Sequence, residues 1–149
     1  MEIKVVRVLP ESALWRQLTE YADSCSWVAG PHLAQMLREG RFRDWEAPFA
    51  ALCGGAVVGF CTLLETDYYP ENRYWPWIST IFVDEAFRGR GICGGLIRAA
   101  EQHALAAGFR AVYIPSDMTG FYERYGYVKI DSLVNYGGDT DSVFLKQIG

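Results

Sequence analysis

Apolar residues alternate with polar ones in several short stretches of the chain and recur at helical spacing in others. Alternation predicts β-strands, whereas apolar residues at i, i+3, i+4 and i+7 predict amphipathic helices. The predicted strands are residues 2–9, two strands within 47–66 around Gly54–Gly55, and residues 78–83, 110–116, 127–133 and 142–148. The predicted helices are residues 11–25 opened by Pro10, 31–40 closed by Gly40, 92–107 stopped by Gly108, and a short helix at 119–126.

The order of these segments predicts a mixed α/β (α+β) fold. Strands joined by short turns pair antiparallel, so most of the sheet should be antiparallel, with one strand-helix-strand unit at residues 78–116. The long helix of that unit should lie on the sheet through one face, formed by Cys93, Leu96, Ile97, Ala100 and Ala104. With 149 residues, half of them hydrophobic, and no linker or repeat, the chain should form a single domain, residues 1–149.

Composition and charge narrow the classes of function. A net charge of -4 argues against a nucleic-acid partner, which would need a basic surface. No apolar run approaches the ~20 residues of a spanning helix, and the first ten residues resemble a strand more than a signal peptide. We therefore expect a cytoplasmic protein with no membrane partner. The cysteines have no paired spacing typical of a metal site and should be reduced, and they are Cys25, Cys53, Cys61 and Cys93.

Arg88 and Arg90 stand among glycines between the strand at 78–83 and the helix that follows. A helix N-terminus leaves N–H groups unpaired and carries partial positive charge, so it favours phosphate oxygens. Glycines let an anion approach the backbone, and nearby arginines add charge at the rim. The turn therefore predicts an anion site. The alternative is a solvated surface turn whose glycines serve only tight packing.

The same turn also matches a dinucleotide-binding pattern. Residues 89–94 have the sequence G-x-G-x-x-G, and Asp117 follows roughly 20 residues further on. In that pattern the strand runs almost directly into the first glycine, whereas the segment DEAFR separates Val83 from Gly89. Too few residues follow Asp117 for a doubly wound parallel sheet. Dinucleotide binding is therefore the weaker interpretation.

Two motifs resemble the GNAT superfamily of acyl-CoA-dependent N-acetyltransferases. The segment VDEAFRGRGICGGLI resembles the superfamily pattern of a strand ending in Val, then Arg/Gln-x-x-Gly-x-Gly/Ala and a helix. Arg88, Gly91 and Cys93 occupy the three defining positions, although Cys93 replaces the usual Gly or Ala. The segment GFYERYGY resembles a later aromatic motif of the superfamily. The resemblance is specific over residues 78–128 and implies a GNAT-like fold, a mostly antiparallel sheet flanked by helices.

The resemblance implies acetyl-CoA as the cofactor. The backbone from Arg88 to Gly94 would hold the CoA pyrophosphate, and the strand at 78–83 would offer main-chain groups to the pantetheine arm like an added strand. In the superfamily this strand and the strand at 111–114 splay apart to admit the thioester. The cofactor-binding residues implied are Ile81, Phe82, Val83, Arg88, Gly89, Arg90, Gly91, Ile92, Cys93 and Gly94.

The resemblance also implies direct attack of an amine on the thioester, with a backbone N–H polarising its carbonyl oxygen. Tyr122 matches the proton-donor tyrosine of the superfamily, whereas a tyrosine in isolation would be interpreted as a packed aromatic. Glu65 and Asp67 are the candidates for a general base, and the alternative for each is a solvated loop carboxylate. The aromatic segment 68–77 would either wall the acceptor pocket or cover the sheet.

Several points stay open at the level of sequence. The acceptor would be a small-molecule or peptide amine of unknown identity, and the protein a monomer or homodimer. A non-catalytic acyl-CoA-binding module is the alternative function, since it would keep the arginine-glycine turn without needing Tyr122. Cys93, at a helix start beside two arginines, should have a lowered pKa and a reactive thiol if solvent reaches it, and the alternative is an inert thiol buried under the helix.

Overall fold

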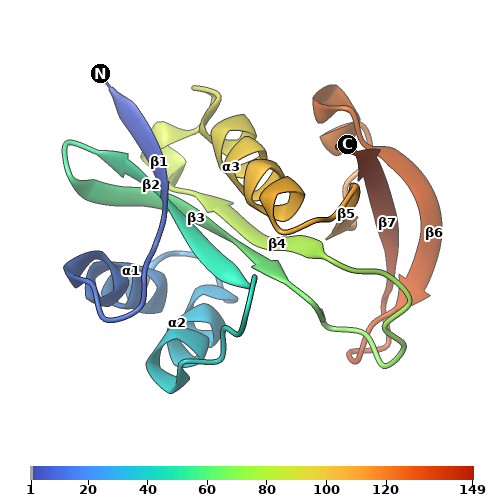
Figure 1. The fold of residues 1–149 in the computed structure, drawn as a ribbon, viewed down its shortest axis with the longest axis horizontal. Coiled ribbons are helices and arrows are strands. Elements are labelled where there is room, and N and C mark those ends of the chain that lie inside the picture. Colours follow the sequence, from blue (N-terminus) through green and yellow to red (C-terminus); the bar gives the residue numbers. More distant parts are fainter. Residues whose placement is uncertain (1) are drawn as a thin grey trace.

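Seven strands form one mixed sheet in the computed structural model, which describes residues 2–149 (Figure 1). The strands are β1 Ile3–Arg7, β2 Ala47–Cys53, β3 Ala56–Leu64, β4 Trp77–Val83, β5 Ala111–Ser116, β6 Val128–Val134 and β7 Thr140–Gln147. The α-helices are α1 Ala13–Ser24, α2 Gly30–Glu39 and α3 Ile92–Ala106. Two short 3-10 helices are η1 Glu85–Phe87 and η2 Tyr122–Tyr125.

The strands lie in the order β1-β2-β3-β4-β5-β7-β6. Every neighbouring pair is antiparallel except β4 and β5, which are parallel and connected through α3. Gly54 and Gly55 close the β2–β3 hairpin with φ of 58° and 83°, as a type I′ turn requires. The mixed, mostly antiparallel fold predicted from the sequence is confirmed. The described strands form no doubly wound parallel sheet, so the fold does not support the dinucleotide interpretation.

Helices cover the sheet on both faces, α3 on one and α1 with α2 on the other (Figure 1). On the α3 face the buried contacts come from Leu96, Ile97, Ala100 and Ala104 against Phe49, Cys61 and Leu63. On the opposite face they come from Leu18, Ala22, Leu33 and Leu37 against Ala50, Phe60 and Phe82. The predicted helix face is therefore buried except at Cys93, which is only partly buried at the start of α3.

The first helix starts later than the sequence pattern predicts. Glu11 has a φ of 64°, which lies outside the helical region, and the Ser12 side chain accepts a hydrogen bond from the Trp15 N–H at 3.1 Å. A serine N-cap of this kind satisfies one of the free N–H groups of the first turn. The helix therefore begins at Ala13 and not near Pro10. The short helix predicted at 119–126 is likewise shorter in the structure, where only η2 forms.

A separate aromatic cluster covers the sheet near the ends of β4 and β5. Tyr69 stacks on Trp77 with ring centroids 5.6 Å apart, and Tyr74 stacks on Tyr113 at 5.0 Å. Leu133 and Val143 complete the cluster. Tyr69, Tyr74 and Trp77 of the aromatic segment 68–77 therefore cover the sheet, whereas Tyr68 and Trp75 are largely exposed. Tyr68 and Tyr69 also line the cleft described below, so both alternatives for this segment apply in part. Among residues 2–149, no helix has the length and apolar character needed to cross a bilayer.

Candidate active site

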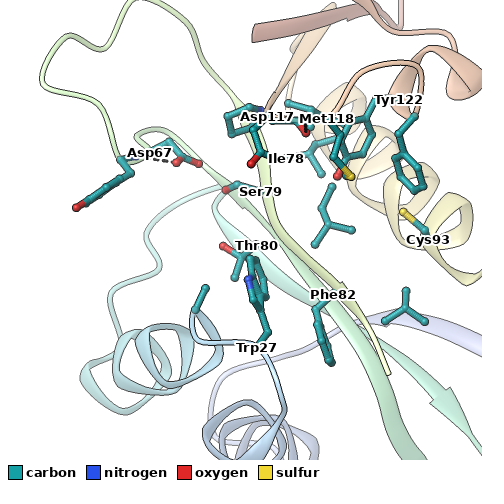
Figure 2. Close-up of a pocket in the computed structure, with 18 of the residues that line it drawn as sticks. Trp27, Asp67, Ile78, Ser79, Thr80, Phe82, Cys93, Asp117, Met118 and Tyr122 are labelled. Atoms are coloured by element: carbon teal, nitrogen blue, oxygen red, sulfur yellow. Dashed lines mark hydrogen bonds between the residues drawn. The ribbon is translucent and has the colours of Figure 1, made fainter. Parts of the chain in front are cut away.

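Strands β4 and β5 diverge after a single ladder pair. Trp77 pairs with Tyr113, and the Tyr113 N–H donates to the Pro76 carbonyl at 3.1 Å. Beyond this point β4 pairs only with β3, and β5 only with β7. A cleft of about 1760 Å³ lies at the divergence, lined along both strands by residues 78–83 and 114–118 (Figure 2). The splay that the resemblance implied is therefore present, and it leaves one edge of β4 without a strand partner.

A β-bulge distorts β4 in the middle of the cleft. The β3–β4 register shifts between Phe60 and Thr62, and Thr80 on β4 has a φ of 54°. That conformation is unusual for a β-branched residue and marks local strain. The buried Thr62 hydroxyl donates to the Ser79 carbonyl at 3.0 Å and lies 3.3 Å from the hydroxyls of Ser79 and Thr80. These contacts hold the bulge, a feature often found beside active sites.

The arginine-glycine turn forms one end of the cleft. Gly89 and Gly91 have φ of 79° and 76°, and a Cβ at either position would meet no atom within 4 Å. Gly91 is the N-cap of α3 and offers no side-chain cap, so the first N–H groups of the helix have no intrahelical partner. The Arg88 Nε donates to the Val83 carbonyl at 2.9 Å, and its guanidinium lies over the Phe82 ring. This end of the cleft can accept an anion such as a pyrophosphate.

Most of the cofactor residues expected from the sequence line this cleft. They are Ile81, Phe82, Val83, Arg88, Gly89, Gly91, Ile92 and Cys93. Arg90 and Gly94 are not among the lining residues. The Arg90 guanidinium lies over the Phe87 ring, 5.3 Å from its centroid. A Cβ on Gly94 would come 2.9 Å from the Tyr125 ring, so close packing explains this glycine better than anion approach does.

Tyr122 lies on η2, almost fully buried, and lines the cleft. Its ring packs against Phe121 and Phe144 at centroid distances of 4.9 and 6.1 Å. Burial, with Cys93 nearby, raises the pKa of the Tyr122 phenol well above its usual range. The hydroxyl is therefore protonated at neutral pH and can donate a proton or a hydrogen bond.

Cys93 occupies the same side of the cleft as Tyr122 (Figure 2). Burial raises the pKa of the Cys93 thiol, and this effect outweighs the opposing influence of Tyr125 and Arg124. The expectation of a lowered pKa for the Cys93 thiol is therefore wrong, and the raised pKa favours the alternative of an unreactive thiol. The physical reason is that Arg88 and Arg90 lie over Phe82 and Phe87, while the thiol is withdrawn from water.

The two candidate bases differ in position. Asp67 lines the cleft beside Ser79, whereas Glu65 is exposed and is not among the lining residues (Figure 2). Burial raises the pKa of the Asp67 carboxyl and the charge of Asp141 adds to it, although hydrogen bonds from the Tyr68 N–H and the Ser79 hydroxyl partly offset this. Asp67 thus has the environment of a proton acceptor, while Glu65 does not contact the cleft.

Trp27 and Asp141 of the cleft carried no signal in the sequence, and Asp117 was noted there only for the dinucleotide pattern. Trp27, in the loop between α1 and α2, stacks on Phe82 at 6.0 Å with an interplanar angle of 9°. Asp117 follows β5, and Asp141 on β7 accepts hydrogen bonds from Tyr69 and Asn135 at 2.9 and 3.0 Å. These residues come from segments far apart in the chain. The described residues hold no group of three or more His, Cys, Asp or Glu placed to bind a metal ion.

Solved structures share this fold over nearly the whole chain. The crystal structure of an aminoglycoside 6'-acetyltransferase type Ii has a TM-score of 0.76 and 19% identity, with 98% of this chain and 97% of that chain covered. An aminoglycoside 6'-N-acetyltransferase complexed with coenzyme A has a TM-score of 0.74 and 15% identity, with the same coverage of 98% and 97%. At these identities the likeness is one of fold.

Sequence comparisons give evidence beyond the likeness of fold. Over 64 residues the chain is 42% identical to Acetyltransferase Atu2258 of Agrobacterium fabrum (strain C58 / ATCC 33970), and the match covers 41% of this chain and 47% of that protein. It thus spans about half the length of that relative. A model of the Acetyltransferase (GNAT) family matches residues 12–127, which include β4, the arginine-glycine turn, α3 and Tyr122. The chain belongs to the GNAT acetyltransferase family.

Proposed function

We propose that this protein transfers an acetyl group from acetyl-CoA to a primary amine by direct attack in a ternary complex. The observation that carries the proposal is the unpartnered edge of β4, which shares one cleft with the open helix N-terminus at Gly91 and with the protonated Tyr122. Together these groups supply an anion site, a row of main-chain groups and a proton donor.

The residues present fit acetyl-CoA. The backbone of residues 88–93 would hold the pyrophosphate through free N–H groups, and the edge of β4 at residues 81–83 would pair with the amides of the pantetheine arm. Acetyl-CoA supplies a thioester that an amine can attack. A solved structure of the same fold is complexed with coenzyme A, which supports CoA as the ligand.

Three groups of the chain have proposed roles in the transfer. A main-chain N–H of β4 near the Thr80 bulge would polarise the carbonyl oxygen of the thioester. Tyr122 would protonate the departing thiolate, since it lines the cleft and its phenol carries a proton at neutral pH. Asp67 would accept a proton from the acceptor ammonium, so that the neutral amine attacks, because its raised pKa makes it a stronger base than an exposed carboxylate. Glu65 has no role in this scheme.

The charges of the cleft favour a cationic acceptor. The turn at Arg88 lies at one end, whereas three carboxylates, Asp67, Asp117 and Asp141, line the part of the cleft that would receive the amine. Carboxylates attract amines that carry more than one positive charge. Aminoglycosides belong among the candidates, since two solved structures of the same fold are aminoglycoside acetyltransferases.

A thiol-release assay with acetyl-CoA tests the proposal. The panel contains aminoglycosides, polyamines, amino acids and short peptides with free N-termini, and mass spectrometry identifies the product amide. We expect turnover with at least one polycationic amine and none without protein. Binding of CoA without turnover on any amine would instead favour a non-catalytic acyl-CoA-binding module. Absence of CoA binding would contradict the proposal as a whole.

A further inference from the structure

The turn that leads from β4 into α3 depends on one aspartate. The Asp84 N–H donates to the Val58 carbonyl at 2.8 Å, and its own carbonyl accepts from the Phe87 N–H at 2.8 Å. One carboxylate oxygen, Oδ1, accepts from the Ala86 N–H at 3.1 Å and caps η1. Asp84 therefore fixes the direction in which the chain enters the arginine-glycine turn.

The other carboxylate oxygen of Asp84 is held by a different element. The Tyr21 hydroxyl on α1 donates to Asp84 Oδ2 at 3.0 Å. The Tyr21 ring is fixed by Phe60, edge-on at 6.1 Å, and by Phe82 at 6.4 Å. Burial and the hydrogen bond to Asp84 raise the pKa of Tyr21, so the hydroxyl keeps its proton. Neither Tyr21 nor Asp84 lines the cleft.

We propose that Tyr21 is a positioning residue for the phosphate-binding turn. Its hydroxyl fixes the Asp84 carboxylate, the carboxylate caps η1, and η1 places residues 88–91 for the pyrophosphate. Affinity for CoA thus depends on a hydrogen bond from α1, a helix that gives no residue to the turn. This inference rests on the proposed function, because it assumes that the turn binds CoA.

A second contact ties the cleft to the segment that follows α1. Trp27 follows α1 and stacks on Phe82, and the Arg88 guanidinium lies over that same ring. Removing the Tyr21 hydroxyl leaves these apolar contacts in place, because phenylalanine keeps the ring. The effect of Tyr21→Phe should therefore appear in the binding of the cofactor and not in that of the acceptor.

The experiment compares CoA binding by calorimetry for the wild type, Tyr21→Phe and Tyr74→Phe. Tyr74 makes the same kind of bond, from its hydroxyl to Asp131 Oδ2, but belongs to the aromatic cluster and does not line the cleft. We expect Tyr21→Phe to weaken the CoA Kd by roughly three- to tenfold, the range of the net contribution of one typical hydrogen bond. Tyr74→Phe should leave the Kd unchanged, even if it lowers the Tm equally.

Two further readouts separate positioning from general destabilisation. With an active amine, Tyr21→Phe should raise the KM for acetyl-CoA and leave kcat and the acceptor KM unchanged. In a double-mutant cycle, Tyr21→Phe should add nothing to Asp84→Ala, because its partner is already absent. An unchanged Kd in Tyr21→Phe, an equal loss in Tyr74→Phe, or additive effects would each overturn the inference. A wild type that does not bind CoA would contradict the proposed function itself.

Discussion

Three side chains of the cleft owe their chemical state to the loss of water around them. Burial raises the pKa of Tyr122, Asp67 and Cys93 alike. The sequence motif was enough to select Tyr122, because its neighbours along the chain carry the resemblance. The motif could not predict the raised pKa of Cys93. This thiol is partly buried beside Tyr125, which lies more than thirty positions away in the chain. Residue-scale chemistry here depends on packing that local sequence does not show.

Replacing Tyr122 with phenylalanine tests its role as proton donor. Only one hydroxyl is lost, so the fold and the CoA Kd should persist while kcat falls. Positioned acid catalysis is worth ~10²–10⁴-fold, and a thiolate is already a fair leaving group, so we expect a loss near ~10². Steady-state kinetics and a CoA titration measure both quantities. Unchanged turnover would remove Tyr122 from the mechanism, and loss of CoA binding would assign it to the cofactor site.

The raised pKa of Asp67 predicts a pH-dependent stability. At low pH the carboxyl is protonated in both the folded and unfolded states and contributes nothing. As the pH rises from the ordinary pKa of an aspartate toward the raised pKa of Asp67 in the folded state, the carboxyl ionises first in the unfolded chain. The wild type therefore loses stability over this range of pH. Asp67→Asn cannot ionise. The free energy of unfolding of this variant, measured with urea, should therefore gain on that of the wild type as the pH rises above about 4, the ordinary pKa of an aspartate. A difference that stays constant or shrinks over that range would count against burial as the cause.

At the scale of elements, the strand-turn-helix unit from β4 to α3 follows closely from the sequence. The predicted limits of its strand and helix agree with the structure within one residue, because alternation, helical spacing and glycine turns are local signals. The bulge at Thr80 was not predicted, since it depends on the buried Thr62 hydroxyl of the neighbouring strand. The same limit applies to α1, whose start is set by the unusual backbone of Glu11 and the Ser12 cap.

Gly91→Asp tests the turn as the anion site. Gly91 caps α3 with a φ of 76° and open space around it, so an aspartate would add backbone strain and a negative charge where the pyrophosphate is proposed to bind. The rise in Tm caused by CoA should disappear. Gly138→Asp is the matched control, because Gly138 also has a positive φ, 88°, and open space, but it does not line the cleft. Retention of the CoA-induced rise in Gly91→Asp would place the cofactor elsewhere.

At the scale of the whole molecule, the cleft exists because two parts of the sheet meet at one ladder pair. β1 to β4 form one part and β5 to β7 the other, joined at Trp77 and Tyr113. The sequence predicted a mixed sheet and, through the resemblance, a splay. It did not predict that Trp27, Asp67 and Asp141 line the same cleft, because they come together only when both parts of the sheet and the loops are assembled.

Amide hydrogen exchange can test the unpartnered edge of β4. Saturating CoA should slow exchange in residues 78–83, because the cofactor would shield main-chain groups that now face the cleft. β2 is the internal reference, since it pairs with β1 on one side and β3 on the other and should change little. Equal slowing in β2 and β4 would indicate general stabilisation without binding along β4.

The two ends of the cleft differ in the kind of secondary structure that forms them. The proposed cofactor end consists of a strand edge and a helix start, whereas Asp67 and Asp117 of the proposed acceptor end stand in loops and only Asp141 is on a strand. Loops tolerate substitution and insertion far better than a sheet does. In evolutionary terms, a lineage with this architecture can exchange one acceptor for another through a few loop mutations. The donor site, tied to the sheet itself, would be inherited without change.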